Sequence, residues 1–301
     1  MELRSDEIDF AEYLSKTEHS REIFEKSAFR EDLDDYIDNA HLRKGSYLPW
    51  NKSADKVGIR HGEVSLWAGI NGHGKSLMVG QAVLGLLEQR EKVMVCSFEM
   101  SPEHCLTSML RQASCSSAMS KPDREAFFNW KKDHLYMFKK RGKVSHDVLL
   151  GACKYAVDHY GVKHIVIDNL TLVMEEDDDY NGQKRFILRL TELANDLNVH
   201  FHLVVHCRKG NDEYTPPNKF DIKGTGSLID LAQYIFIIHR NMKKKDDLEN
   251  GLPYDHTIAD ATFQVVKQRG GDGWLGTIPL WFDADSKQFM STSRGFPHRY
   301  I

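Results

Sequence analysis

The stretch GINGHGKS, residues 69–76, limits the folds open to this chain more than any other part of the sequence. It fits the pattern GxxxxGK[ST] and lies between an apolar run typical of a strand and a longer helical pattern. Gly69, Gly72 and Gly74 allow backbone N–H groups to point at phosphate oxygens, and the start of the helix adds the positive end of its dipole. The stretch therefore predicts a phosphate-binding loop.

The loop also predicts roles for individual side chains. Lys75 is expected to neutralise the β- and γ-phosphates of a nucleotide, and Ser76 to hold Mg²⁺. Arg240 and Asn241, with the aromatic pair Trp281 and Phe282, are expected to flank the base. The predicted nucleotide-binding residues are Gly69, Asn71, Gly72, His73, Gly74, Lys75, Ser76, Leu77 and Arg240.

Apolar runs alternate with helical patterns from His61 onward, which predicts an α/β fold. The runs are EVSLWAG, KVMVCSFEM, KHIVIDNL, HFHLVVHC, YIFIIHR, TFQVVKQR and TIPLWFD. Continuous apolar strands between helices indicate a mostly parallel sheet with helices on both faces. The last two runs are separated by a glycine-rich stretch and predict an antiparallel hairpin. Two helical faces support this fold, one with Phe186, Leu190, Leu193 and Leu197, the other with Leu149, Cys153 and Ala156 before a Gly161 cap.

Three predicted strands end in residues that can carry chemistry. Asp168 ends an apolar strand, as the Mg²⁺-binding carboxylate of a Walker B strand does. Glu99 is predicted at the end of the strand beside the phosphate loop, where it could polarise an attacking water; a surface carboxylate is the alternative. His206 ends a third strand and could contact the γ-phosphate, although a strand-end histidine with a structural role is the alternative.

Composition adds limits rather than a function. The 301 residues are 41% hydrophobic and carry a net charge of −4, so a nucleic-acid partner would need a local basic surface. The five cysteines form no CxxC pair, which argues against a zinc site or a disulfide framework. Without a membrane-length apolar run or a leader-like N-terminus, the expectation is a cytoplasmic protein with no membrane partner.

Together these stretches resemble the RecA-like hexameric helicases of the DnaB superfamily, in particular the phage ring helicases and the Twinkle helicase. The blocks GEVSLWAGINGHGKS, SFEMS, HIVIDNL through HLVVHCRKG, and DIKGTGSLIDLAQYIFIIHRN occur in the family's order. The resemblance implies Glu99 as catalytic base, His206 as sensor, and a basic finger in VVKQRGG formed by Lys267 and Arg269. These residues and Lys75 make up the expected catalytic set.

The same resemblance implies partners and a domain plan. Residues 1–48 are expected to be a helical linker that serves assembly, and residues 49–301 a RecA-like ATPase domain. The implied substrates are ATP, or another NTP or dNTP, with Mg²⁺, and single-stranded DNA at a replication fork. A homohexamer in a bacterial or phage-infected cell is implied. A separate primase is possible, and the alternative is that this chain is one part of a longer product. The expected DNA-binding residues are Arg208, Lys209, Lys223, Gly224, Thr225 and Gly226.

The leading hypothesis is therefore a ring helicase that unwinds duplex DNA, moving 5′ to 3′ as the family does. A RecA-like DNA-binding ATPase without processive unwinding, such as a recombinase or mediator, is the alternative. A nucleotide-gated assembly factor that hydrolyses little is a third reading. Glu99, Lys267 and Arg269 argue against it, since a purely gated binder does not need them.

Overall fold

The computed structural model describes residues 30–38, 45–140, 142–173, 179–208, 210, 212–269 and 273–301. The helices are α2 (Arg30–Asp38), α3 (Lys75–Glu88), α4 (Pro102–Ser114), α5 (Lys121–Asn129), α6 (His146–Tyr160), α7 (Tyr180–Leu197), α8 (Gly226–Leu231) and α9 (Met242–Glu249). The strands are β1 (Ser46–Tyr47), β2 (Gly58–Ile59), β3 (Val64–Gly69), β4 (Val93–Ser97), β5 (Leu135–Met137), β6 (His164–Asp168), β7 (His200–His206), β8 (Tyr234–Arg240), β9 (Ala261–Gln268), β10 (Gly276–Asp283) and β11 (Gln288–Met290). Short 3-10 turns occupy Asn51–Ser53, Leu170–Val173 and Lys219–Asp221.

One large sheet forms the centre of the molecule, with strand order β11-β10-β9-β8-β3-β7-β6-β4-β5. The strands from β8 to β5 are parallel, whereas β9, β10 and β11 join antiparallel at the other end. The predicted mostly parallel sheet is therefore confirmed, and so is the hairpin of β9 and β10. Because parallel strands run in one direction, Gly69, Ser97, Asp168, His206 and Arg240 all reach the same carboxyl edge.

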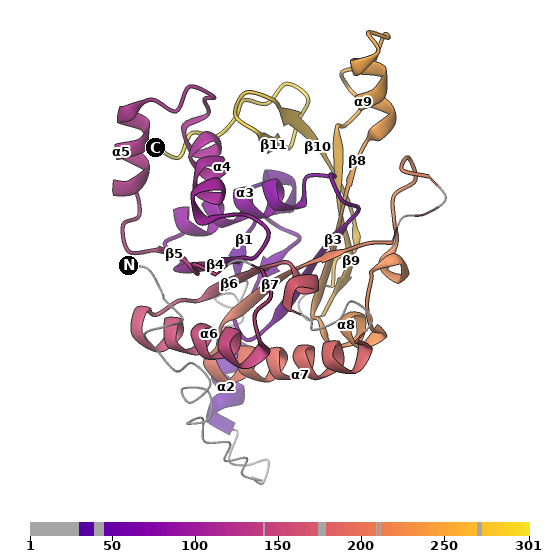
Figure 1. Cartoon of the computed structure of the whole chain (residues 1–301). Helices are drawn as coiled ribbons and strands as arrows, with labels where there is room; N and C mark the ends of the chain where they lie inside the picture. The colour runs from indigo at the N-terminus through magenta and orange to yellow at the C-terminus, as the bar shows by residue number, and fades with distance from the viewer. Residues whose placement is uncertain are drawn as a thin grey trace.

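Helices cover both faces of this sheet, as Figure 1 shows: α6 and α7 lie on one face, and α3 and α4 on the other. The first interface buries the two helical faces predicted from the sequence, with Leu149, Cys153 and Phe186 fully buried. The second buries α3 on nearly all sides, between the sheet and α4. The helix that begins at the phosphate loop is thus embedded in the core, which fixes the position of the loop.

Helix ends follow the sequence signals. Ser145 accepts a hydrogen bond from Val148 N at the start of α6, and Gly161 ends the helix with a φ of 68°. Asn198 takes the same left-handed conformation after α7. These caps separate the covering helices from the strands that follow.

Some expectations were wrong or incomplete. The strand predicted to end at Glu99 ends at Ser97, so Glu99 lies in a bend two residues beyond β4. The edge strands β5 and β11 were not predicted, and Ser46–Tyr47 forms a strand inside the expected helical segment 1–48. Within that segment α2 is helical, but residues 1–29 and 39–44 lie outside the described residues. None of the described helices combines the length and apolarity needed to cross a membrane.

Candidate functional site

The phosphate loop joins β3 to α3 through two glycines in left-handed conformations, Gly72 with φ 81° and Gly74 with φ 86°. A Cβ atom on Gly69 would lie 2.5 Å from the carbonyl oxygen of Ile238, so only glycine fits at the start of the loop. Asn71 and Gly72 are exposed at its tip. The loop therefore has the backbone that the sequence predicted, with its N–H groups next to the start of a helix.

Lys75 lies under the loop rather than in solvent. Its Nζ donates to the carbonyl oxygens of Gly69 and Ile70, both at 3.0 Å. Burial lowers the pKa of Lys75, although the Asp168 carboxylate acts in the opposite direction. The ammonium group is thus held within the loop where a phosphate would bind.

Ser76 and Asp168 come together as predicted. Ser76 Oγ donates to Asp168 Oδ2 at 2.9 Å, which connects the first turn of α3 to the end of β6. Burial raises the pKa of Asp168 to about 6, while the Ser76 hydrogen bond works against that shift. A buried carboxylate beside a hydroxyl at the phosphate loop is a suitable oxygen pair for a hard cation.

A residue that the sequence reasoning missed connects the two strand-end candidates. The side-chain amide of Asn169 donates to Glu99 Oε1 and lies 2.7 Å from His206 Nε2. Asn169 is 1% exposed, so it is fixed, whereas the Glu99 side chain is 47% exposed. Burial, and then the charge of Lys75, lower the pKa of His206, which favours the neutral ring that accepts this hydrogen bond. The sequence could have indicated Asn169, because this residue directly follows Asp168 at the end of a predicted strand.

His73 has a structural role within the loop. Its Nδ1 accepts the backbone N–H of Arg240 at 3.1 Å, which ties the loop to the end of β8. Burial, and then the nearby His239, lower the pKa of His73 to about 4, so the ring is neutral at pH 7. The link holds the end of β8 beside the phosphate loop.

A cavity of about 310 Å³ opens beside the loop, next to residues expected to flank the base. Gly72, His73, Gly74, Leu77, Arg240, Asn241 and Phe282 are among its lining residues. Trp281 is not: its indole Nε1 donates to the carbonyl of His256, and its ring lies 5.1 Å from Lys52 Nζ. Adjacent residues of a strand point to opposite faces, so the predicted aromatic pair is split and Phe282 alone faces the cavity.

The expected DNA-binding residues lie in the segment that runs from the end of β7 to the first residue of α8. Cys207 and Ile222 form an antiparallel bridge, and the N–H of Lys223 donates to the carbonyl of His206 at 2.8 Å. The side chains of Arg208 and Lys223 are exposed at the base of this loop, whereas Lys209 lies outside the described residues. Phe220, which the sequence reasoning overlooked, is 73% exposed with Lys219 Nζ 5.2 Å from its ring.

The two glycines of KGTGS, Gly224 and Gly226, lie in different surroundings. Gly224 has a φ of 119°, and a Cβ there would lie 2.5 Å from Gln183 Oε1. The same Gln183 oxygen accepts the N–H of Thr225 at 2.9 Å, and Thr225 in turn caps α8. Gly224 and Thr225 therefore anchor the loop to α7, while Gly226 is exposed with open space around it.

Lys267 and Arg269, the residues of the predicted finger, lie at the end of β9 that is away from the carboxyl ends of the parallel strands. β9 is antiparallel to β8, with Ala261 opposite Arg240 and Lys267 opposite Ile235. At about 3.3 Å per residue, the end of β9 is about 20 Å from the carboxyl edge. Arg269 is exposed there, whereas Lys267 donates to the carbonyls of Ile229 and Asp230 in α8. Neither residue reaches the phosphate loop of its own chain.

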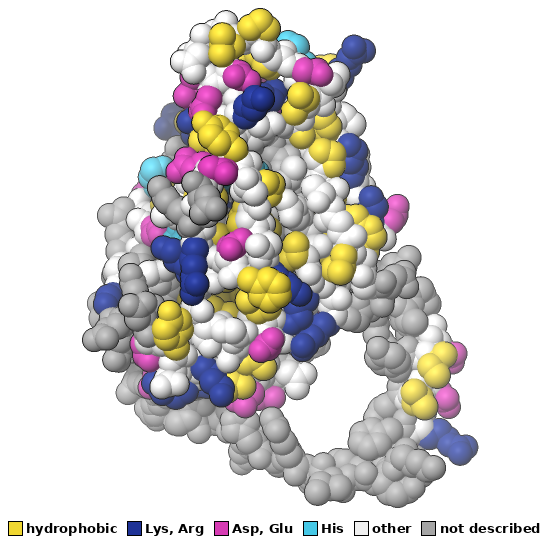
Figure 2. All heavy atoms as spheres, turned by 90° about the vertical axis from the view of Figure 1, so that its right-hand side faces the viewer, with side chains coloured by type: hydrophobic (Ala, Val, Ile, Leu, Met, Phe, Trp, Pro, Cys, Tyr) yellow, Lys and Arg dark blue, Asp and Glu magenta, His cyan; other side chains and the backbone are white. Residues whose placement is uncertain are grey.

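Comparison with known proteins now decides the family. The model of a family described as "AAA domain" matches residues 49–212, more than half of the chain. The chain belongs to the AAA domain family. Figure 2 shows the side of this AAA domain on which α8 and α9 lie, where lysines and arginines are scattered among acidic and hydrophobic side chains.

Two curated proteins have sequences similar to this chain. The Twinkle homolog protein of Arabidopsis thaliana is 22% identical over 92% of this chain and 41% of its own length. The DNA helicase/primase of Enterobacteria phage T3 is 25% identical over 62% of this chain and 37% of its own. The chain thus spans about two fifths of the length of the curated relatives it matches.

Solved structures confirm the predicted fold class. One of them, described as an ATPase domain, superposes with a TM-score of 0.71 at 18% identity, over 87% of this chain and 98% of that domain. A DnaB-like replicative helicase superposes with a TM-score of 0.69 at 16% identity, over 92% of this chain and 69% of that helicase chain. The AAA domain therefore has the RecA-like fold of DnaB-type ATPase domains, which is a nucleotide-binding fold, and the predicted resemblance is confirmed.

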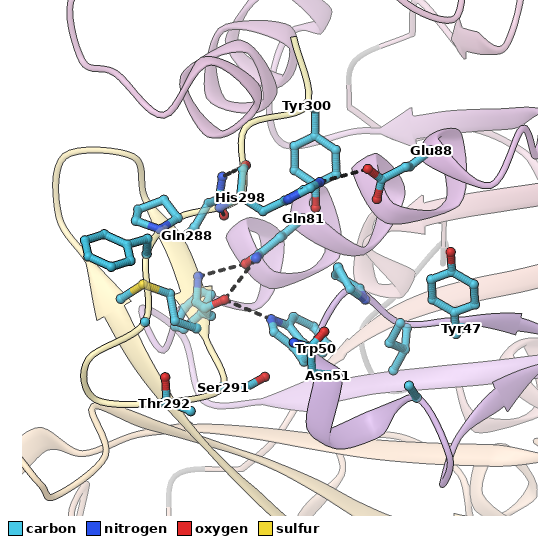
Figure 3. A pocket seen from close by; sticks show the side chains of 18 residues that line it. Tyr47, Trp50, Asn51, Gln81, Glu88, Gln288, Ser291, Thr292, His298 and Tyr300 are labelled. Carbon is cyan, nitrogen blue, oxygen red and sulfur yellow. Dashed lines mark hydrogen bonds and ion pairs between the residues drawn. The ribbon is translucent and has the colours of Figure 1, made fainter.

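A second cavity, of about 470 Å³, lies behind α3 (Figure 3). The carbonyl of Phe289 accepts hydrogen bonds from Trp50 Nε1 at 3.2 Å and from Gln81 Nε2 at 2.9 Å. On another side of the cavity, His298 Nε2 lies 2.8 Å from Glu88 Oε1. None of the predicted site residues lines this cavity, which joins the start of the AAA domain to the C-terminal segment.

Proposed function

We propose that this chain is the motor domain of a replicative ring helicase. It hydrolyses ATP, or another NTP or dNTP, moves along single-stranded DNA from 5′ to 3′, and unwinds the duplex at a fork. The names of the two relatives, a Twinkle homolog and a DNA helicase/primase, support this assignment. The cytoplasm of a bacterial or phage-infected cell is the compartment that fits such a motor.

One observation carries the proposal: His206 belongs to both candidate sites. Its ring contacts Asn169 beside the phosphate loop, and its carbonyl accepts the N–H of Lys223 in the exposed basic loop. A change at the γ-phosphate that moves His206 therefore moves the backbone that carries Lys223. Such a direct connection is what coupling hydrolysis to DNA movement requires.

The chemistry follows from the same residues. Glu99 is the base that accepts a proton from the attacking water, and Asn169 holds its carboxylate near His206. Lys75 stabilises the phosphate charge from within the loop. Ser76 and Asp168 fit Mg²⁺, since hydroxyl and carboxylate oxygens are its preferred ligands and these two lie 2.9 Å apart. When bound, the ion would neutralise charge on the phosphates.

Assembly into a ring completes the site. The exposed Arg269 follows the end of β9 that lies away from its own phosphate loop, which supports a role in the site of a neighbouring copy. A guanidinium supplied by a neighbour stabilises charge at the transferred phosphoryl group. The proposed assembly is a homohexamer around one DNA strand. Residues 1–48 would help to hold it, since Leu33 and Ile37 of α2 are 55% and 61% exposed.

Fork unwinding by the purified chain tests the assignment. With ATP, Mg²⁺ and a forked duplex, we expect strand displacement and DNA-stimulated hydrolysis. Glu99→Gln should bind nucleotide but hydrolyse it at least ~10²-fold more slowly, and Lys75→Ala should bind nucleotide weakly. DNA-stimulated hydrolysis without displacement would favour a recombinase or mediator instead. Slow turnover that DNA does not stimulate would favour the nucleotide-gated assembly factor.

A further inference from the structure

A second cluster of potential ligands lies at the amino edge of the sheet, opposite the nucleotide site. His61 precedes β3, Glu91 precedes β4, and His164 begins β6. Because these parallel strands start at one edge, the three side chains meet there. His61 Nε2 lies 3.6 Å and His164 Nε2 3.8 Å from Glu91 Oε2, and the three ligand atoms all lie within 4.8 Å of one another.

These separations are too long for good hydrogen bonds. The Nε2 atoms of His61 and His164 are buried, and neither has a hydrogen-bond partner among the described residues. His164 is 0% exposed and points at the carboxylate from the sheet. A buried polar atom in a folded protein normally has a partner, so two such atoms facing one carboxylate indicate a missing ligand.

The separations suit a shared metal ion. A zinc ion bound to imidazole nitrogen at about 2.0–2.1 Å and to carboxylate oxygen at about 2.0–2.2 Å in tetrahedral geometry holds its ligands roughly 3.4 Å apart. The distances from the two imidazole nitrogens to Glu91 Oε2, 3.6 and 3.8 Å, exceed that value by at most about 0.4 Å. The His61 and Glu91 side chains are both partly exposed, so a water molecule can supply a fourth ligand from solvent.

Neighbouring groups orient these ligands as in metal sites. His164 Nδ1 lies 3.2 Å from His202 Nε2, and His202 Nδ1 lies 3.2 Å from Ser65 Oγ. The indole N–H of Trp67 is within reach of both Ser65 Oγ, at 3.1 Å, and His202 Nδ1, at 3.2 Å. When it donates to Ser65 Oγ, a proton on each Nδ1 satisfies both histidine contacts and leaves His164 Nε2 with a free lone pair toward Glu91. The other oxygen of Glu91 accepts from Ser46 Oγ at 2.8 Å.

We propose that His61, Glu91 and His164 bind one divalent transition-metal ion, with zinc the best match to two imidazoles and a carboxylate. The ion has a structural role. It fastens the starts of β3, β4 and β6 to one another. Through the hydrogen bond from Ser46 to Glu91, it also holds β1 against the sheet.

Cobalt provides a direct test. The full chain is treated with chelator, kept in excess Mg²⁺ to fill any site at Ser76 and Asp168, and titrated with Co²⁺. We expect one equivalent to bind and produce a visible d–d band without the near-ultraviolet band of a thiolate ligand. Zn²⁺ should displace the cobalt, and adding Zn²⁺ to the chelated chain should raise its unfolding temperature.

Variants locate the ion. His61→Gln removes a partly exposed ligand and should fold, yet it should bind Co²⁺ at least tenfold more weakly and lose the zinc-dependent rise in unfolding temperature. His159→Gln changes an exposed histidine at the end of α6 and should match the parent chain. The proposal is overturned if the parent chain binds no cobalt, if a thiolate band appears, or if His61→Gln binds as tightly as His159→Gln.

Discussion

Asn169 lies 2.7 Å from His206 through its side-chain amide, which places a buried hydrogen-bond donor between two strand ends. The same amide donates to Glu99, so the proposed base and the proposed sensor share one partner. Glu99 extends from a bend rather than from a strand, and its carboxylate accepts a hydrogen bond from Asn169 and lies 3.7 Å from His206 Nε2. Under the proposed function, we expect Asn169 to position Glu99 for hydrolysis.

Asn169→Ala should therefore lower the turnover number for ATP at least ~10-fold, because the base loses its orientation, while nucleotide affinity stays near normal. Asn169→Asp should be at least as slow, since its carboxylate cannot donate and repels Glu99. Steady-state ATPase assays and fluorescent-nucleotide titrations measure the two effects. Asn195→Ala, an exposed position on α7, is the matched control. Equal losses of affinity and turnover would instead mean a damaged fold.

Phe220 and Lys223 should contribute to DNA binding in different ways. Lys223→Ala should reduce the slope of log affinity against log salt by about one ion, because one phosphate contact is lost. Phe220→Ala should weaken single-strand binding by about 1–3 kcal/mol with an unchanged slope, because base stacking releases no counterions. Fluorescence anisotropy at several salt concentrations separates the two. Phe128→Ala, which removes a 66% exposed ring from α5, should have no effect. Parallel behaviour of all three variants would place the DNA elsewhere.

His73 predicts a specific pH dependence of stability. Its pKa is about 4 in the folded chain, below the ordinary 6.5, because burial and His239 disfavour the charged ring. Between these values the unfolded chain binds more protons, so the free energy of unfolding falls as the pH falls from 6.5 to 4. Protonation of His73 should lower the free energy of unfolding by roughly 3 kcal/mol over this range, at about 1.4 kcal/mol per pKa unit.

Urea unfolding at pH 7, 5.5 and 4.5 measures that slope. His73→Asn keeps an acceptor for the N–H of Arg240 but cannot be protonated, so its stability should fall less over this range. His73→Ala lacks the acceptor and should be less stable than His73→Asn at pH 7. If the parent chain and His73→Asn show the same pH dependence, another group titrates.

Arg269 and Lys75 test whether the active site is shared between copies. An Arg269→Ala chain has an intact phosphate loop, and a Lys75→Ala chain has an intact finger. Mixed rings of the two inactive variants should recover part of the ATPase activity, from interfaces that pair a good loop with a good finger. Native mass spectrometry verifies mixing, and Arg124→Ala on α5 is the control for an exposed arginine. Mixed rings without any recovered activity would contradict a finger that acts on the neighbour.

Long, regular elements could be predicted from the sequence, and so could the residues tied to them. The phosphate loop, Asp168 and His206 lie where the pattern of strands and helices put them, because apolar runs and glycines act locally. β5 and β11 have three residues each and depend on neighbours distant in the sequence, so no local pattern marks them. Asn169 was missed for a related reason, since its importance comes from Glu99 and His206 meeting it in space.

The carbonyl of Phe289 connects the chain near Trp50 to α3. It accepts hydrogen bonds from Trp50, at the start of the AAA domain, and from Gln81, in the middle of α3. The N–H of Phe289 returns the contact to Gln81 Oε1 at 2.8 Å, so the last strand is clamped to α3 from both sides of one residue. Any pull on the chain ahead of Trp50 is thereby carried to the helix that begins at Lys75. The path from Trp50 to the phosphate loop therefore runs through a single residue of the edge strand β11 and then along α3, and it bypasses the other strands of the sheet.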